Sequence, residues 1–184
     1  MSPWQRLLEL LKVHSYRKQR VTLASGKESD FFIDCKQTIL GAEGHALTGE
    51  ILYEAVQQLR PCHAVAGVEL GGCPLASAVS LTSFLRDEPL DAIYVRKEVK
   101  DHGSRRTLEG DVRLPAGARV VLLEDVITTG GSTLKAVAKL TDAGHTVAGV
   151  VVLVDRLEGG REAIEAAGLT VRAIYTRTDF DPSV

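Results

Sequence analysis

The residue types best suited to chemistry stand together in residues 124–133, which read EDVITTGGST. The segment opens with two adjacent acids and continues with small and hydroxylated residues that lead toward a predicted helix. Gly130 and Gly131 allow the backbone to turn its N–H groups toward one point, and the Thr and Ser hydroxyls add further donors. Since a helix N-terminus also carries a partial positive charge, the segment predicts a cradle for a phosphate monoester that needs no lysine.

The two acids, Glu124 and Asp125, must have a different use, because carboxylates do not bind phosphate directly. They can accept hydrogen bonds from the vicinal hydroxyls of a ribose, or reach a magnesium ion through its waters. The alternative is an ordinary strand-to-helix turn with Ser and Thr caps and solvated acids. The chain has no Gly-Lys-Ser/Thr of a Walker loop and no G-x-G-x-x-G of a nicotinamide site. A ligand that joins a phosphate to a ribose therefore fits best.

A second segment, residues 96–110, is rich in charge and follows another predicted strand. Its basic residues are Arg96, Lys97, Lys100, His102, Arg105 and Arg106, and its acids are Glu98, Asp101 and Glu109. Two glycines allow the segment to bend and apolar anchors are nearly absent, so we expect a lid that a multiply charged anion orders. The alternative is an exposed, solvated loop. The position after a strand favours the lid, because it puts the segment on the same rim as residues 124–133.

The elements that must position these segments follow from the hydrophobic pattern. Helical spacing predicts a helix over residues 4–11, a β-like pattern over 21–40 predicts a hairpin that turns at 24–27, and a helix is expected over 43–59. Beyond Pro61, strand, loop and helix repeat, with strands expected at residues 64–68, 92–95, 119–123, 147–154 and 171–175. These strands are continuous apolar runs, so we expect a parallel sheet with helices on both faces. Ligands of such sheets collect at the carboxyl ends of the strands.

Length and charge exclude several classes of protein. The 184 residues hold 22 Lys and Arg against 24 Asp and Glu, so no basic field is available for nucleic acid or an anionic membrane. The longest apolar run, residues 147–154, is far shorter than the ~20 residues of a membrane span, and the first residues lack the apolar stretch of a signal peptide. Three cysteines without a C-x-x-C pair argue against a disulfide framework or a zinc site. We expect a single cytoplasmic domain over residues 1–184, with no nucleic acid or membrane partner.

Two of these segments resemble a known family. Residues 124–133 resemble the phosphoribosyl diphosphate signature of the type I phosphoribosyltransferases, and the pattern Arg-Lys-Glu-x-Lys-Asp-His-Gly at residues 96–103 is similar to the catalytic loop of the orotate phosphoribosyltransferases. Ser25-Gly26, Phe31-Phe32 and Asp155-Arg156 extend the resemblance over most of the chain. The resemblance implies an α/β fold of the type I phosphoribosyltransferase kind, a parallel sheet flanked by helices with a small N-terminal hood formed mainly by about residues 1–40.

The resemblance also implies a reaction. It is the Mg²⁺-dependent transfer of ribose 5-phosphate from 5-phosphoribosyl 1-diphosphate to N1 of orotate, giving orotidine 5′-phosphate and diphosphate in the de novo synthesis of UMP. The implied partners are these two small-molecule substrates and a second copy of the chain, in a homodimer with shared active sites. Mg²⁺ is the implied cofactor, held mainly by the substrate diphosphate and the ribose hydroxyls, with no direct protein ligand.

Roles for single residues follow from the same resemblance. It implies catalytic roles for Lys100, His102 and Asp125. Orotate is expected to contact Thr128, Arg156, Phe32 and Ile33, with the hairpin that contains Ser25 as a hood over its ring. By spacing alone, Phe31 and Phe32 would be core residues, and Arg156 would form a surface pair with Asp155. The implied donor-binding set is Arg96, Lys97, Lys100, His102, Glu124, Asp125, Val126, Ile127, Thr128, Thr129, Gly130, Gly131 and Ser132.

The chain departs from the family pattern at two positions. Many members have a lysine where this chain has Ala24, and another where it has Gly71. We expect weaker diphosphate binding, or a shift of that work to Arg105 and Arg106, while the turn at Gly71-Gly72 can still offer backbone N–H groups. Two rivals stay open: a transferase of the same fold that acts on a purine or uracil, and a regulatory module that senses the donor and binds nucleic acid.

Overall fold

A six-stranded sheet forms the centre of the computed structural model, which describes residues 1–22, 28–97 and 106–181. The strand order is β5-β4-β3-β6-β7-β8. The strands are β3 (Ala64–Val68), β4 (Asp91–Val95), β5 (Leu108–Glu109), β6 (Arg119–Ile127), β7 (Thr146–Asp155) and β8 (Val171–Thr176). All pairings are parallel except that of the two-residue edge strand β5, which runs antiparallel to β4. The predicted parallel sheet is confirmed.

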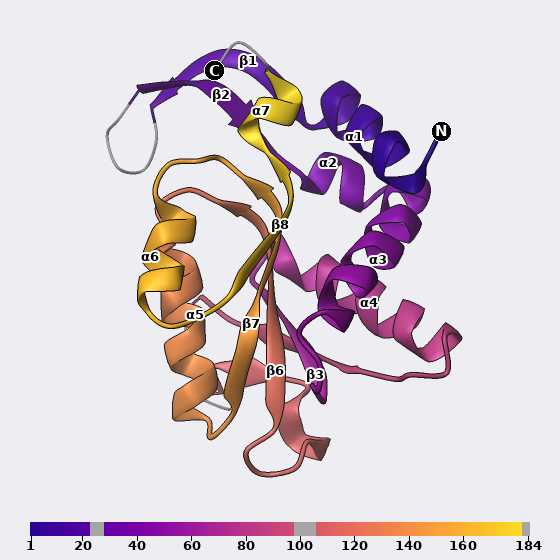
Figure 1. Ribbon diagram of the computed structural model, residues 1–184, viewed down its shortest axis with the longest axis vertical. Helices are drawn as coiled ribbons and strands as arrows, with labels where there is room; N and C mark the ends of the chain where they lie inside the picture. Colours follow the sequence, from indigo (N-terminus) through magenta and orange to yellow (C-terminus); the bar gives the residue numbers. More distant parts are fainter. Residues whose placement is uncertain (23–27, 98–105, 182–184) are drawn as a thin grey trace.

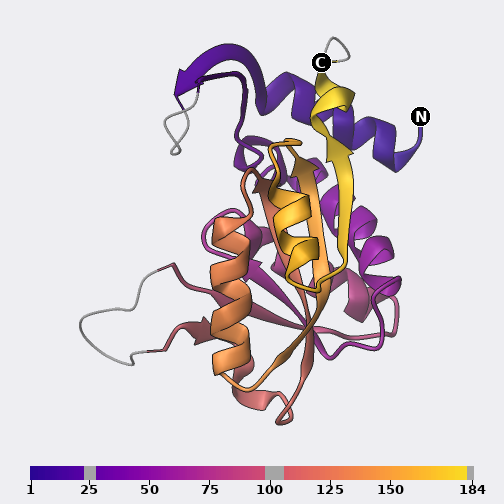
Figure 2. The ribbon, with the colours of Figure 1, turned by 60° about the vertical axis from the view of Figure 1, so that its left-hand side comes forward.

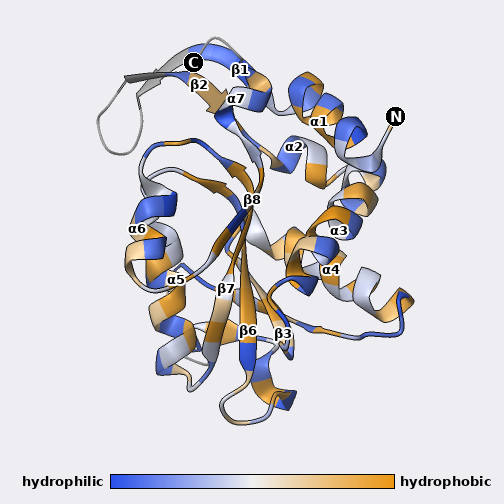
Figure 3. Ribbon diagram, viewed as in Figure 1, coloured by the Kyte–Doolittle hydropathy of each residue, from blue (hydrophilic) through white to orange (hydrophobic). Residues whose placement is uncertain are grey.

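Helices cover both faces of this sheet (Figures 1 and 2). On one face, α3 (Ala42–Gln57) and α4 (Gly72–Leu85) pack against side chains such as Val121 and Leu123. On the other, α5 (Gly131–Asp142) and α6 (Gly160–Ala166) pack against the alternate residues of the same strand, including Leu122. Because both faces are buried, the strands are apolar throughout, and Figure 3 shows β6 as hydrophobic along most of its length.

A smaller layer, here called the hood, lies over the carboxyl ends of the strands (Figure 1). It consists of α1 (Pro3–His14), β1 (Tyr16–Thr22), β2 (Glu28–Ile33), α2 (Lys36–Ile39) and α7 (Arg177–Phe180). The strands β1 and β2 pair antiparallel, as the predicted hairpin requires. The core of the hood is an aromatic cluster in which the centroids of neighbouring rings lie 4.8–6.3 Å apart. It is formed by Trp4, Tyr16, Phe31, Tyr175 and Phe180.

The structure corrects two of the expected boundaries. The pattern predicts β structure up to residue 40, but the chain turns into α2 at Lys36, where the backbone N–H groups of Ile39 and Leu40 donate to carbonyl oxygens four residues earlier. The chain's last helix, α7, joins the hood through Phe180, beside the elements of residues 1–40 that were expected to form most of it. Strand β6 does not end at residue 123: it continues to Ile127, because β7 is long enough to pair with it up to Ile127–Asp155.

None of the helices in the described ranges combines the length and the apolar character that a membrane span requires.

Candidate active site

A cavity of about 220 Å³, here called the rim cavity, opens at the carboxyl ends of the central strands β3 and β6. It is bounded by the hood, the loop after β3, the end of β4, strand β6 and the first turn of α5. Its lining residues are Lys36, Val68, Glu69, Leu70, Gly71, Lys97, Glu124, Asp125, Val126 and Ser132. This is the place where ligands of parallel sheets collect. Six of the ten residues had been predicted from the sequence: Gly71, Lys97, Glu124, Asp125, Val126 and Ser132.

The two adjacent acids face opposite sides of the sheet, because side chains alternate along a strand. Glu124 turns toward α5 and is only 4% exposed. One of its carboxylate oxygens, Oε1, accepts hydrogen bonds from Thr133 Oγ1 (2.9 Å) and Ser132 Oγ (3.3 Å). Burial, with a smaller contribution from the neighbouring charge of Asp125, raises the pKa of Glu124 to about 7. Glu124 can therefore lose or keep its proton near neutral pH.

Asp125 turns toward the hood. Its Oδ1 accepts a hydrogen bond from the backbone N–H of Val126 (3.0 Å). Burial raises the pKa of Asp125, and the nearby cation of Lys36 opposes that rise. The carboxyl group also lies against Gly71, where an added Cβ would come within 2.0 Å of Asp125 Oδ2. The absence of a side chain at Gly71 therefore leaves the space that the Asp125 carboxylate occupies.

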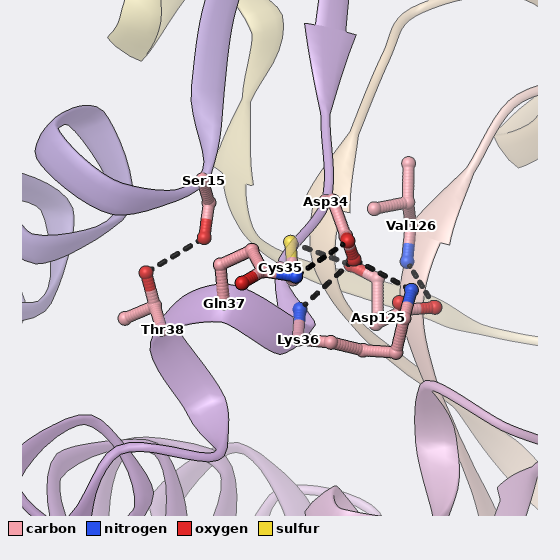
Figure 4. A network of polar contacts seen from close by, with 8 residues as sticks. All are labelled: Ser15, Asp34, Cys35, Lys36, Gln37, Thr38, Asp125 and Val126. Atoms are coloured by element: carbon pink, nitrogen blue, oxygen red, sulfur yellow. Dashed lines mark hydrogen bonds and ion pairs between the residues drawn. The ribbon is translucent and has the colours of Figure 1, made fainter.

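Lys36 extends from the start of α2 toward Asp34 and Asp125 (Figure 4). Its Nζ lies 2.5 Å from Asp34 Oδ1, and this contact raises the pKa of Lys36. Asp34 is held in turn by Gln37 Nε2 (3.1 Å) and by the backbone N–H of Lys36 (3.3 Å). Sequence reasoning missed Lys36, because the hydrophobic pattern placed it in a strand. The only sequence feature that pointed to Lys36 as a site residue was its position directly after the hairpin.

The predicted phosphate cradle lies between β6 and α5. Gly130 has φ +78°, a left-handed conformation that favours glycine, and an added Cβ would meet Gly160 O at 2.9 Å. Ile127 and Gly130 are buried, Thr128 is half-buried, and Thr129, Gly131 and Ser132 are exposed. Helix α5 begins at Gly131, so the free N–H groups of its first turn lie at the exposed residues of the cradle. Its twelve residues give it a dipole whose positive end lies there as well. The arrangement suits a phosphate monoester, as the sequence predicted.

The charged segment is only partly described. Lys100, His102 and Arg105 lie outside the described residues, as do Ala24 and Ser25 of the hairpin. Arg96 pairs with Glu109 across β4 and β5 (Nη1 to Oε1, 3.1 Å). The backbone N–H of Lys97 donates to Glu69 Oε2 (2.9 Å), which ties the end of β4 to the loop after β3.

A lysine of α5 also holds this segment. Lys139 Nζ donates to the carbonyl oxygens of Arg96 (2.6 Å) and Lys97 (2.9 Å). Sequence reasoning missed this contact, since nothing in the pattern of a helix indicates which carbonyl groups of another strand its lysines reach. A second cavity of about 310 Å³ lies beside Lys139. Its lining residues are Val68, Val95, Arg96, Lys97, Ser132, Lys135, Ala136 and Lys139.

The residues expected to contact orotate lie where the hood meets the sheet. Phe31 is buried in the aromatic cluster, whereas Phe32 is 41% exposed and Ile33 is half-buried. Spacing alone had put both phenylalanines in the core, which is wrong for Phe32, because neighbouring residues of β2 face opposite sides. The backbone N–H of Arg156 donates to Ile127 O (3.1 Å), so Arg156 lies at the end of β6 that leads into Thr128.

Arg156 is buried, and its guanidinium bridges the sheet to the hood. Nη2 donates to Phe31 O (2.9 Å) and pairs with Glu158 Oε1 (2.9 Å), while the group lies 5.4 Å from the centroid of the Phe31 ring. The alternative of a surface pair with Asp155 is wrong. Asp155 is itself buried and lies beside Arg161 instead (3.7 Å).

A parallel sheet with a phosphate cradle after β6 and two carboxylates beside it defines a phosphoribosyl-transferring protein. In agreement, the family described as "Phosphoribosyl transferase domain" matches residues 43–169. An orotate phosphoribosyltransferase of Sorangium cellulosum (strain So ce56) is 69% identical over 97% of this chain and 93% of that protein. The chain belongs to the orotate phosphoribosyltransferase family.

Solved structures agree with this assignment. The orotate phosphoribosyltransferase of Mycobacterium tuberculosis H37Rv in complex with Fe(III) dicitrate superposes with a TM-score of 0.84 at 37% identity, covering 98% of this chain and 99% of that one. The same enzyme in complex with 5-phospho-alpha-D-ribosyl 1-diphosphate superposes with a TM-score of 0.80 at 34% identity, covering 97% and 99%. The predicted type I phosphoribosyltransferase fold is confirmed.

Proposed function

We propose that this chain catalyses the Mg²⁺-dependent transfer of ribose 5-phosphate from 5-phosphoribosyl 1-diphosphate to N1 of orotate. The observation that carries the proposal is the order of groups along the rim cavity. Ser132 at the start of α5 stands beside Glu124, and Asp125 stands beside Gly71 and Lys36. That order matches the donor, whose phosphate, ribose hydroxyls and diphosphate follow one another along the molecule. The products are orotidine 5′-phosphate and diphosphate, in the de novo synthesis of UMP.

The donor's 5-phosphate is assigned to the cradle. Thr128, Thr129, Gly130, Gly131 and Ser132 would surround it with backbone and hydroxyl donors, and Val126 and Ile127 set the end of the strand that leads into them. No lysine is required, because the N-terminus of α5 supplies the positive potential.

The ribose is assigned to the two acids. Glu124 and Asp125 accept hydrogen bonds from its two hydroxyls. We assign the catalytic role to Asp125, because the cation of Lys36 lies beside it, whereas the hydrogen-bond partners of Glu124 are the neutral hydroxyls of Ser132 and Thr133. Bond breaking at the anomeric carbon would develop positive charge on the ribose, which these carboxylates stabilise.

Charge on the departing diphosphate needs cations. We assign Arg96, Lys97, Lys100 and His102 to it, with Lys100 and His102 as catalytic residues on the strength of the motif at residues 96–103. His102 would donate a hydrogen bond or a proton to the leaving group. In the shared active sites of a homodimer, part of this set comes from the second copy of the chain.

Orotate is assigned to the space between hood and sheet. Phe32 and Ile33 face the pyrimidine ring, Thr128 contacts it from the cradle, and Arg156 orients toward its carboxylate. The buried position of Arg156 between Phe31 O and Glu158 supports this, because a planar guanidinium fixed in one orientation suits a carboxylate.

Mg²⁺ fits the rim cavity as a substrate-held ion. The carboxylates of Glu69, Glu124 and Asp125 are oxygen donors of the kind that hydrated Mg²⁺ prefers. Within the described part of the chain, no three His, Cys, Asp or Glu side chains are grouped as metal ligands. We assign most of its ligands to the donor's diphosphate and ribose hydroxyls, together with water, and the ion would neutralise charge on the diphosphate.

We also propose that the chain acts as a single domain, residues 1–184, in a cytoplasmic homodimer. The end of α4 supports an interface, because Leu81, Phe84 and Leu85 are 57%, 68% and 71% exposed there. Apolar side chains gathered in this way mark contact surfaces more often than free ones.

The direct test is to mix the protein with orotate, donor and Mg²⁺ and to follow the loss of orotate absorbance. We expect loss that depends on all three components, with orotidine 5′-phosphate as the product. Adenine, guanine and uracil serve as competing acceptors, and preferential consumption of one of them would favour the purine or uracil rival. A mobility shift with nucleic acid tests the regulatory rival, and we expect none.

A further inference from the structure

We propose that Lys36 binds the diphosphate of the donor, as a cation that the hood supplies to the rim cavity. The proposal rests on the proposed function and concerns a residue outside the motif segments at 96–103 and 124–133. Lys36 lines the cavity together with Leu70 and Gly71. Its Nζ is held at 2.5 Å from Asp34 Oδ1, beside Asp125 (Figure 4).

The charges in the rim cavity call for such a cation. Three acids line it, Glu69, Glu124 and Asp125, and a diphosphate brings several further negative charges. Among the described lining residues, the cations are Lys36 and Lys97 alone. The backbone N–H groups near Gly71 can position an anion, but they do not offset its charge.

The order of contacts places Lys36 at the diphosphate end. Glu124 is bonded to Ser132 and Thr133 on the α5 side of β6, whereas Asp125 contacts Gly71 on the opposite side. If the 5-phosphate occupies the start of α5 and the ribose lies over the acids, the diphosphate must extend toward Gly71. Of the lining residues that the structure describes, Lys36 is the cation whose charge acts on Asp125.

Asp34 is the positioning residue for this lysine. An ammonium group has three donors, so Lys36 can keep its bond to Asp34 while it donates to a phosphate oxygen. Gln37 Nε2 and the backbone N–H of Lys36 keep Asp34 in place independently of the lysine side chain. Removal of the ammonium group should therefore leave the local fold intact.

The test uses Lys36→Met, with Lys36→Arg as the conservative variant and Lys12→Met, on the exposed side of α1, as the matched control. Calorimetry with Mg²⁺ compares three probes: the donor, inorganic diphosphate and ribose 5-phosphate. We expect Lys36→Met to weaken the binding of the donor and of diphosphate by about 10- to 100-fold, the usual size of a lost charge-assisted hydrogen bond. Ribose 5-phosphate should bind within about twofold of wild type, and Lys36→Arg should recover most of the loss.

Lys36→Met also leaves the Asp34 carboxylate without its ion-pair partner, so that carboxylate could itself repel the diphosphate. A double variant separates this repulsion from the loss of a direct contact. In Asp34→Asn/Lys36→Met that carboxylate is gone, so affinity for diphosphate should stay low if Lys36 contacts the anion. Recovery in the double variant, wild-type affinity in Lys36→Met, or an equal loss for ribose 5-phosphate would each overturn the inference. The proposed function fails on a separate result, namely a wild-type protein that consumes no orotate.

Discussion

The rim cavity has two walls, defined here by lining residues and the side chains that contact them. The two walls balance the negative charge of a carboxylate with different groups. The α5 wall, formed by Glu124, Ser132 and Thr133, surrounds a buried carboxyl with neutral hydroxyls. The hood wall, formed by Asp34, Lys36 and Asp125, sets two carboxylates around an ammonium group. Two carboxyls that are neighbours in the sequence therefore differ in the groups that balance them.

This difference matches the two ends of the proposed donor. A 5-phosphate stays bound to the ribose throughout the reaction, so a wall of hydroxyls and backbone N–H groups is sufficient to position it. The diphosphate gains charge as it leaves, and cations beside it stabilise that change directly. The walls are therefore expected to respond differently to substitution, in stability for one and in donor affinity for the other.

The largest effect is expected on the α5 wall, from Glu124→Gln. The pKa of Glu124 rises from an ordinary 4.5 to about 7, so the folded state binds its proton more tightly than the unfolded state does. The free energy of unfolding must then fall as pH rises from 4.5 to 7, by about 3 kcal/mol for a shift of this size. Glutamine cannot ionise and can still accept the hydrogen bonds of the two hydroxyls. The free energy of unfolding of the variant should therefore exceed that of wild type by this amount at pH 8.

Urea unfolding at pH 5 and pH 8 measures this difference, with the exposed Glu165→Gln of α6 as the matched control. The gap between wild type and Glu124→Gln should widen with pH, while the gap for the control stays constant. Parallel profiles for all three proteins would show that Glu124 is as easily ionised as an exposed acid, and the contrast between the walls would disappear.

On the hood wall, Asp125→Asn should reduce donor affinity by about 10- to 100-fold, because a charged acceptor for a ribose hydroxyl is lost. Asparagine keeps the shape of the side chain and its place beside Val126. Calorimetry with the donor and Mg²⁺ measures the loss. An unchanged affinity would contradict the ribose role of Asp125.

Gly71→Ala should act through the same carboxylate, with a smaller loss of about 10-fold in kcat/KM. An added Cβ would lie 2.0 Å from Asp125 Oδ2, so the carboxyl must move away from the ribose. A double-mutant cycle tests the route, since coupled residues are not additive. In an Asp125→Ala background the added methyl group has room, and Gly71→Ala should then cost nothing more. Additive losses would show that the glycine matters for its backbone instead.

The two walls also differ in how far the sequence could predict them. The residues of the α5 wall all lie within residues 124–133, so their acid and hydroxyls were visible, together with the glycines between them, as one pattern with one chemistry. The strands and their order of occurrence were equally visible, because burial on both faces makes each strand an apolar run. The length of β6 was missed, since the acids interrupt the run before the hydrogen-bonded ladder ends. The two-residue edge strand β5 was also missed, because it lies within the charged segment.

The hood wall is assembled from residues far apart in the chain. Lys36 lies near Asp125 because the short helix α2 packs against α1 and α3, and four residues carry too little periodicity to predict a helix. The contribution of α7 was missed for the same reason. Contacts of this kind depend on tertiary packing, and the resemblance to the family, which rests on local motifs, does not include them.

The smallest effect is expected where α5 meets the end of β4, from Lys139→Met. Lys139 Nζ donates to the carbonyl oxygens of Arg96 and Lys97, so it positions the backbone from which both proposed diphosphate-binding side chains extend. Methionine fills the same space without the donors, and the two cations should lose part of their orientation. We expect the KM for the donor to rise about three- to tenfold, in line with the loss of a hydrogen bond or two of ordinary strength, while the KM for orotate stays constant. Lys135→Met is the matched control, because within the described residues Lys135 lines the same cavity without a hydrogen bond to either carbonyl. An equal effect of both variants would mean that α5 contributes general positive charge, and that the precise anchoring of Arg96 and Lys97 is unimportant.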